Sequence, residues 1–249
     1  MSSRAQRIEI VGVAGSGKST LARTLTRRYP ASRVADSLHT RQPAHWPYVA
    51  HSMPRALPLV ARSGWNRPAL SWDEVKFVIY VSEWHRFLRN RREHRSGVTV
   101  MDQGPIFALA RLLWGKKPLT TSAPFQAWLN EMVERWSVEL DAIVWLVAPD
   151  QSLLERINHR EQRHEAKGKS TPEGFELIES HSQAFGQLFD VMAGLGRPRV
   201  LRFDTSTMSP DEIAGELAEI FEEQPARQLT EAPQGLNVGQ RRESAHEDL

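Results

Sequence analysis

The sequence predicts an α/β fold of three layers, in which a five-stranded parallel sheet is flanked by helices. Short apolar runs rich in β-branched residues alternate along the chain with longer segments of helical periodicity, which is the pattern of βαβ units. The chain has 249 residues, of which 40% are hydrophobic, so it is long enough to bury one substantial core. We therefore expect a single ordered domain.

Each predicted element has its own local signal. Five apolar runs predict the strands, at residues 7–13, 32–35, 97–102, 142–147 and 199–203. Helical periodicity predicts helices over about 50–62, 72–95, 105–115, 122–140, 150–165, 173–194 and 209–223. From residue 224 the composition changes to Gln, Glu, Arg, Pro and Gly with few apolar residues. We therefore expect an ordered domain over residues 1–223 and a disordered tail over residues 224–249.

Residues 12–19 match the phosphate-binding pattern G-x-x-x-x-G-K-[ST] in full. In such a loop the glycines let backbone N–H groups turn onto phosphate oxygens, which bulkier side chains would block. Lys18 supplies a positive charge at the β- and γ-phosphates, and the Ser19 hydroxyl can bind Mg²⁺. An apolar strand precedes the loop and a helix follows it, as the motif requires. The residues predicted to bind ATP here are Gly12, Val13, Ala14, Gly15, Ser16, Gly17, Lys18, Ser19 and Thr20.

Two carboxylates follow predicted strands, at the sheet edge where ligands bind in open α/β folds. Asp102 closes the strand at 98–101, which we expect to lie beside the strand of the phosphate loop. Because phosphoryl transfer needs an acidic group near the metal or the attacking oxygen, we predict that Asp102 binds Mg²⁺ or acts as general base. The alternative is that Asp102 only caps the helix beginning near Pro105. Asp36 follows the weak strand 33–35 and is either a contact to the acceptor or a turn residue.

Basic residues gather between 156 and 169. Arg156, Arg160 and Arg163 fall at i, i+4 and i+7, which predicts one side of one helix. The segment then loosens, so we predict a lid over about 156–172 that closes on the triphosphate and brings guanidinium groups to the transferred phosphoryl. The alternative is a solvated helix whose glutamates neutralise the arginines. Trp72, in the insertion before the third strand, is either core or a stacking platform for a flat acceptor.

Composition excludes several classes of protein. The net charge of +2 gives no sign of a nucleic-acid partner, and zero cysteines exclude disulfides and thiolate metal sites. No run of 18 apolar residues and no signal-peptide pattern occur, so we expect no membrane contact and a cytoplasmic location. A GTPase switch would need an Asn-Lys-x-Asp motif, and the sequence contains no Asn-Lys pair.

Taken with these motifs, residues 7–222 resemble the P-loop kinases of the thymidylate-kinase and deoxynucleoside-kinase group, which implies the P-loop NTPase fold. Asp102-Gln103-Gly104 occupies the place of the group's acidic–Arg motif, with Gln103 in place of the arginine. Asp204 and Thr205 resemble the loop on the adenine side, and residues 40–43 resemble the Thr-Arg-Glu-Pro segment that approaches the acceptor. The three arginines named above resemble the lid arginines of the group.

The predicted function is therefore a kinase that transfers the γ-phosphoryl group of ATP, with Mg²⁺, to a small molecule, with a nucleoside or nucleotide favoured. Asp36, Arg41 and Trp72 are the candidate contacts to this acceptor. The catalytic candidates are Lys18, Asp102, Arg156, Arg160 and Arg163. The alternative is a P-loop ATPase that regulates or remodels a macromolecular partner. The resembling families are often homodimers, so a homodimer is one assembly that the resemblance allows.

Overall fold

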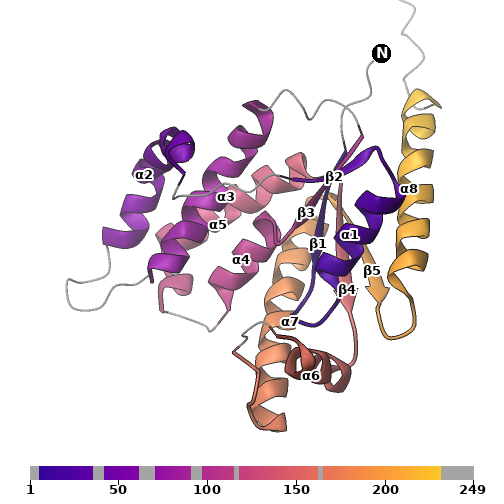
Figure 1. The fold of residues 1–249 in the computed structure, drawn as a ribbon. Helices are drawn as coiled ribbons and strands as arrows, with labels where there is room; N and C mark the ends of the chain where they lie inside the picture. The colour runs from indigo at the N-terminus through magenta and orange to yellow at the C-terminus, as the bar shows by residue number, and fades with distance from the viewer. Residues whose placement is uncertain are drawn as a thin grey trace, which may run out of the picture.

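The computed structural model describes residues 6–35, 42–61, 71–90, 97–114, 118–161 and 165–230 of the chain. Five parallel strands form one sheet in the order β2-β3-β1-β4-β5, with helices on both faces (Figure 1). The strands are β1 (Gln6–Val11), β2 (Ser32–Val34), β3 (Val98–Asp102), β4 (Ala142–Val147) and β5 (Arg199–Asp204). The predicted α/β class and parallel sheet are confirmed, and β3 lies beside β1 as expected.

Helices and short 3₁₀ turns connect the strands. They are α1 (Lys18–Arg28), η1 (Pro43–His45), α2 (Trp46–Ala61), α3 (Trp72–Asn90), α4 (Pro105–Leu113), η3 (Pro118–Thr121), α5 (Ala123–Glu139), α6 (Asp150–His159), α7 (Thr171–Gly194) and α8 (Pro210–Thr230). Helix α8 continues past the expected domain end at residue 223, and residues 231–249 lie outside the described part of the chain. Within that part, no helix combines the length and apolarity needed to cross a membrane.

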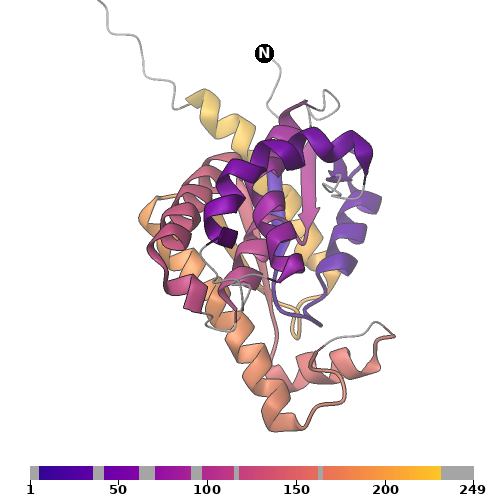
Figure 2. The ribbon, with the colours of Figure 1, turned by 90° about the vertical axis from the view of Figure 1, so that its left-hand side faces the viewer.

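Helix α6 is shorter than the predicted helix over 150–165. Its buried residues are Leu153, Leu154 and Ile157, after which the backbone turns extended at Arg160. No apolar side chain follows at helical spacing in residues 158–161, so nothing holds a further turn against the rest of the protein. Figure 2 shows α6 and the first turns of α7 extending beyond the carboxyl edge of the sheet.

Alternation along β1 divides its side chains between two cores. Ile8 and Ile10 face α1 and α8, and Val11 faces the layer of α3, α4, α5 and α7 (Figure 1). Glu9 has the same parity as Val11, so its carboxylate enters that second layer among buried apolar side chains.

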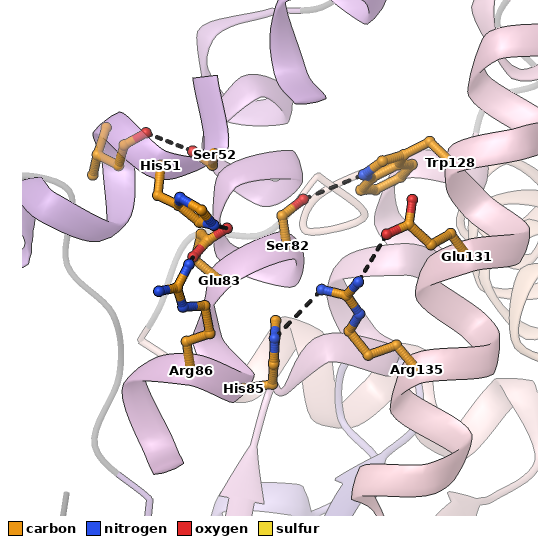
Figure 3. A network of polar contacts seen from close by, with 10 residues as sticks. His51, Ser52, Ser82, Glu83, His85, Arg86, Trp128, Glu131 and Arg135 are labelled. Carbon is orange, nitrogen blue, oxygen red and sulfur yellow. Dashed lines mark hydrogen bonds and ion pairs between the residues drawn. The ribbon is translucent and has the colours of Figure 1, made fainter. Parts of the chain in front are cut away.

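A polar network joins α2, α3 and α5 away from the phosphate loop (Figure 3). The fully buried Glu83 pairs with His51 and Arg86, each at 3.9 Å, and so connects α2 to α3. Burial and the charge of Arg135 lower the pKa of His85 to about 4, so His85 is neutral at pH 7. Arg86, and His51 when it is protonated, offset the burial of Glu83 in α3, the helix whose Phe77 lines the cavity of the candidate site.

Candidate active site

The phosphate loop leaves β1 and enters α1 in a shape that only glycine permits. Gly12 has φ 144°, and a Cβ there would lie 2.4 Å from the carbonyl oxygen of Leu146. Gly17 is the N-cap of α1 at φ 90°, and no side chain caps this helix. The first N–H groups of α1 are therefore left to an anion, which suits the phosphates of a nucleotide.

Lys18 is held against the loop backbone. Its Nζ donates hydrogen bonds to the carbonyl oxygens of Gly12 and Val13, both at 2.9 Å, and the residue is 8% exposed. Burial lowers the pKa of Lys18 to about 8, the charge of Asp102 opposes this shift, and Arg160 adds to it. The ammonium thus lies where the loop would hold a triphosphate.

Asp102 ends β3 beside this lysine. Its Oδ1 is buried and has no hydrogen-bond partner within the described ranges. The N-cap of α4 is Gly104, without any capping side chain from the turn, so the interpretation of Asp102 as a helix cap is wrong. A buried carboxylate oxygen that lacks a partner is costly, and it fits a role that a metal ion or a substrate completes.

The donors around the loop fit a magnesium–nucleotide complex. The Ser19 hydroxyl lies in the exposed first turn of α1, and Asp102 lies across the loop near Lys18. Among the described residues no group of three or more His, Asp or Glu could hold a metal ion alone. Mg²⁺ in nucleotide sites binds few protein oxygens together with waters and substrate phosphates, so Ser19 and Asp102 would be sufficient protein ligands.

A cavity of about 660 Å³ opens directly beside the loop. Aromatic side chains from three helices form its walls, namely Phe77, Phe107 and Phe185. Polar and charged side chains complete the lining, namely Lys18, Gln103, Arg111, Arg160, Glu165 and His181. The cavity therefore joins the predicted phosphate site to a chamber with flat apolar walls, as a small-molecule acceptor would need.

The predicted lid arginines are placed differently from one another. Arg156 donates hydrogen bonds to the carbonyl oxygen of Gly15 at 3.3 Å and to Thr205. It therefore lies between the phosphate loop and the loop after β5, and it is not part of the cavity lining. Arg160 follows the end of α6 and lines the cavity. The prediction of one shared helix face is wrong, because α6 ends before Arg160. Arg163 lies outside the described residues.

The loop after β5 is well held. The backbone N–H of Thr205 donates to the carbonyl oxygen of Val147 at 2.8 Å. Asp204 accepts hydrogen bonds from the backbone N–H and hydroxyl of Ser206, which lower its pKa. Arg156 contacts this loop and the phosphate loop together, so the predicted adenine side and phosphate side are joined.

The acceptor contacts predicted from sequence are only partly described. Asp36 and Arg41 lie outside the described residues. Trp72 begins α3 with 66% of its surface exposed, which excludes a core role, and it is not part of the cavity lining. Phe77, further along the same helix, faces the cavity instead.

Sequence reasoning missed three charged residues. Arg111 of α4 pairs with Glu165 at 3.4 Å, and its guanidinium lies 4.2 Å from the ring centroid of Trp114. Glu9 is fully buried and accepts hydrogen bonds from the backbone N–H groups at the start of α4. A glutamate inside an otherwise apolar strand was the available signal for Glu9, whereas the pair depends on tertiary contacts alone.

Comparisons with known proteins agree with this arrangement. A family model described as "AAA domain" (AAA_33) matches residues 8–174. A search of curated proteins found no match. A solved structure of deoxyadenosine kinase from M. mycoides with bound dATP has a TM-score of 0.50 and 12% sequence identity to this chain. The match covers 87% of this chain and 100% of that chain. Thymidylate kinase from Candida albicans has a TM-score of 0.54 and 18% identity, covering 90% and 94%. These similarities confirm the fold expected from the resemblance.

Proposed function

We propose that this chain, which belongs to the AAA domain family, is an ATP-dependent kinase of a small molecule, with a nucleoside or nucleotide as acceptor. The observation that carries the proposal is the continuity of the phosphate loop with an aromatic-walled cavity, whose lining includes Lys18 and Gln103, the neighbours of Asp102 in charge and in sequence. A cavity in that position presents an acceptor to the γ-phosphate of a nucleotide on the loop.

Each residue has a specific role in the proposed reaction. The loop amides and Lys18 hold the triphosphate and neutralise its charge. Ser19 and Asp102 would hold a bound Mg²⁺, which would neutralise charge on the triphosphate. The buried Oδ1 of Asp102, which has no hydrogen-bond partner among the described residues, would accept the proton of an attacking hydroxyl. Arg160 faces the cavity from the lid side, where it would stabilise charge on the transferred group.

The walls of the cavity favour a flat acceptor. Phe77, Phe107 and Phe185 offer aromatic surfaces on which a base can stack. The two similar structures are named as kinases of a nucleoside and of a nucleotide, which supports this acceptor class. Gln103 lines the cavity where the resembling group has an arginine, so its amide would donate to a neutral oxygen of the acceptor.

The test measures ADP release from Mg²⁺–ATP with a panel of nucleosides, nucleoside monophosphates and sugars. We expect release that depends on one class of acceptor, and a phosphorylated product detected by mass spectrometry. Lys18→Ala should abolish transfer, whereas Arg27→Ala, which removes a 75% exposed charge from the same helix, should not. ADP release that no small acceptor changes, but that a protein or nucleic acid stimulates, would instead favour a regulatory ATPase.

A further inference from the structure

We propose that Glu9 is a positioning residue of this site, which holds the turn at residues 102–104 and thereby fixes Asp102 beside Lys18. Its consequence for turnover rests on the proposed kinase function.

Glu9, on β1, contacts the N-terminus of α4. The side chain is 0% exposed, and its carboxylate accepts hydrogen bonds from the backbone N–H of Ile106 at 2.9 Å and of Phe107 at 2.8 Å. These N–H groups belong to the first turn of α4, which has no capping side chain of its own. Glu9 therefore caps α4 from a different element, 97 and 98 positions away in sequence.

The turn needs such support because its own conformation is unfavourable. Gln103 has φ 60°, a left-handed conformation that side chains other than glycine rarely adopt. Asp102 keeps a buried oxygen without a hydrogen-bond partner in the described part of the chain. Strain of this kind persists only where surrounding contacts impose it, and it is concentrated at functional sites.

Gly104, in the turn, packs its backbone against the carboxyl group of Glu9. A Cβ on Gly104 would lie 2.5 Å from Cδ of Glu9, so the backbone of the turn rests directly on the carboxyl group. Gly104 has an extended backbone with negative φ, so this close approach, and not its conformation, is what requires glycine. The turn and the carboxyl group thus fit together as one unit.

The same strand leads from Glu9 into the phosphate loop. Glu9 lies opposite Met101 in the sheet, and Ile10 lies opposite Asp102. Gly12 follows two residues after Ile10, and its carbonyl accepts from Lys18. Glu9 therefore links Lys18 and Asp102, because its strand β1 leads into the phosphate loop and its carboxyl group holds the turn that contains Asp102.

The proposal differs from a purely structural role in what it predicts for the substitution Glu9→Gln. Both carboxyl oxygens of Glu9 accept a backbone hydrogen bond, and the oxygen that carries the proton can still do so. A glutamine has one acceptor oxygen, so its NH₂ group would face one of the two backbone N–H donors and shift the turn. If Glu9 only stabilised the fold, Glu9→Gln would lower the melting temperature and leave turnover unchanged at temperatures where the protein stays folded.

The experiment compares Glu9→Gln and Gly104→Ala with the control Val144→Ala. Val144 is 0% exposed in β4 and lies opposite Ile10, so truncating it destabilises the same sheet without touching the turn. At a temperature where all variants are folded, we expect Glu9→Gln and Gly104→Ala to lower kcat by about 10–100-fold, as a displaced catalytic group does. The affinity for metal-free ATP, measured in EDTA, should stay within about twofold, because the phosphate loop is unchanged.

A double variant tests whether Glu9 acts through Asp102. In the Asp102→Asn background, Glu9→Gln should cause no further loss of kcat. The proposal would be overturned if the kcat of the double variant fell by the product of the two single losses. It would also be overturned if the kcat of Glu9→Gln equalled that of Val144→Ala.

A second measurement needs no acceptor. The factor by which Mg²⁺ strengthens ADP binding, measured by calorimetry with and without EDTA, should fall in Asp102→Asn and in Glu9→Gln to a similar extent. An unchanged factor in Glu9→Gln alongside a reduced one in Asp102→Asn contradicts the positioning role. If the wild type phosphorylates no acceptor, the proposed function fails, while the role of Glu9 is still decided by this factor.

Discussion

Arg156 of α6 donates hydrogen bonds to the carbonyl oxygen of Thr205 at 3.0 Å and to its Oγ1 at 2.9 Å, while reaching the carbonyl oxygen of Gly15. A single guanidinium therefore connects α6, the phosphate loop and the loop after β5. Its charge is satisfied by fixed acceptors, whereas Arg160 lines the cavity and its Nε has no hydrogen-bond partner among the described residues. The two arginines should consequently affect different kinetic constants.

Arg156→Ala should weaken ATP binding more than turnover. Loss of the guanidinium removes three hydrogen bonds that fix the two loops relative to each other, so we expect KM for ATP to rise by about tenfold with a smaller change in kcat. Steady-state kinetics with ATP as the varied substrate measures this. Glu155→Ala, an exposed position on the same helix, is the control. An unchanged KM for ATP would show that the bridge does not shape the nucleotide site.

ATP affinity should fall as pH rises above about 8. Burial lowers the pKa of Lys18 to about 8, and the triphosphate binds its charged form. Above that pH the lysine must take up a proton when ATP binds, so Kd should rise by about tenfold per pH unit. Calorimetry between pH 7 and 9.5 measures this slope, and Lys18→Met should lack it. The same Kd at pH 7 and 9.5 in the wild type would contradict the assigned pKa.

Glu9 should make the fold less stable as pH rises. Burial raises the pKa of Glu9 from 4.5 to about 8, although its hydrogen bonds with the start of α4 oppose the shift. Between these values the folded protein binds a proton that the unfolded chain has lost. The free energy of unfolding should therefore fall by on the order of 1 kcal/mol per pH unit from about pH 4.5 to 8, with no further loss from this group above.

Urea unfolding at a series of pH values measures this dependence. Glu9→Gln cannot titrate, so its stability should lack the Glu9 slope whatever its absolute value. The difference between the two proteins isolates Glu9 from all other titrating groups. Parallel profiles for wild type and variant between pH 5 and 8 would mean that Glu9 is ionised in the folded state.

Features determined by local sequence could be predicted well. The phosphate loop is specified by glycines whose backbone angles no other residue adopts easily, as at Gly12 and Gly17. The strands at 98–102 and 142–147 are continuous apolar runs, as buried parallel strands must be. The expected pairing of the strand at 98–102 with the strand of the phosphate loop also predicts that Asp102 lies beside the loop, as the sheet shows.

Features determined by tertiary contacts could not. The periodicity of charges between 156 and 163 predicts one helix face, yet α6 ends where buried side chains stop supporting it. The capping group of α4 comes from β1, so no local pattern near Pro105 reveals it. The pairing of Arg111 with Glu165 brings together two segments that are separate in sequence, and its effect on the cavity is visible only in the structure.

Glu165→Gln should shift acceptor preference toward phosphorylated molecules. Glu165 neutralises Arg111 at the cavity, but both side chains are partly exposed, at 59% and 32%, so the pair is weak. Removing the carboxylate leaves the guanidinium, held by Trp114, available to an anion. We expect the ratio of kcat/KM for a nucleoside monophosphate to that for its nucleoside to rise by about two- to fivefold. Arg111→Gln should lower this ratio, and Glu161→Gln, an exposed acid outside the cavity lining, should leave it unchanged. A ratio that moves toward the uncharged nucleoside in Glu165→Gln would mean that Glu165 itself contacts the acceptor.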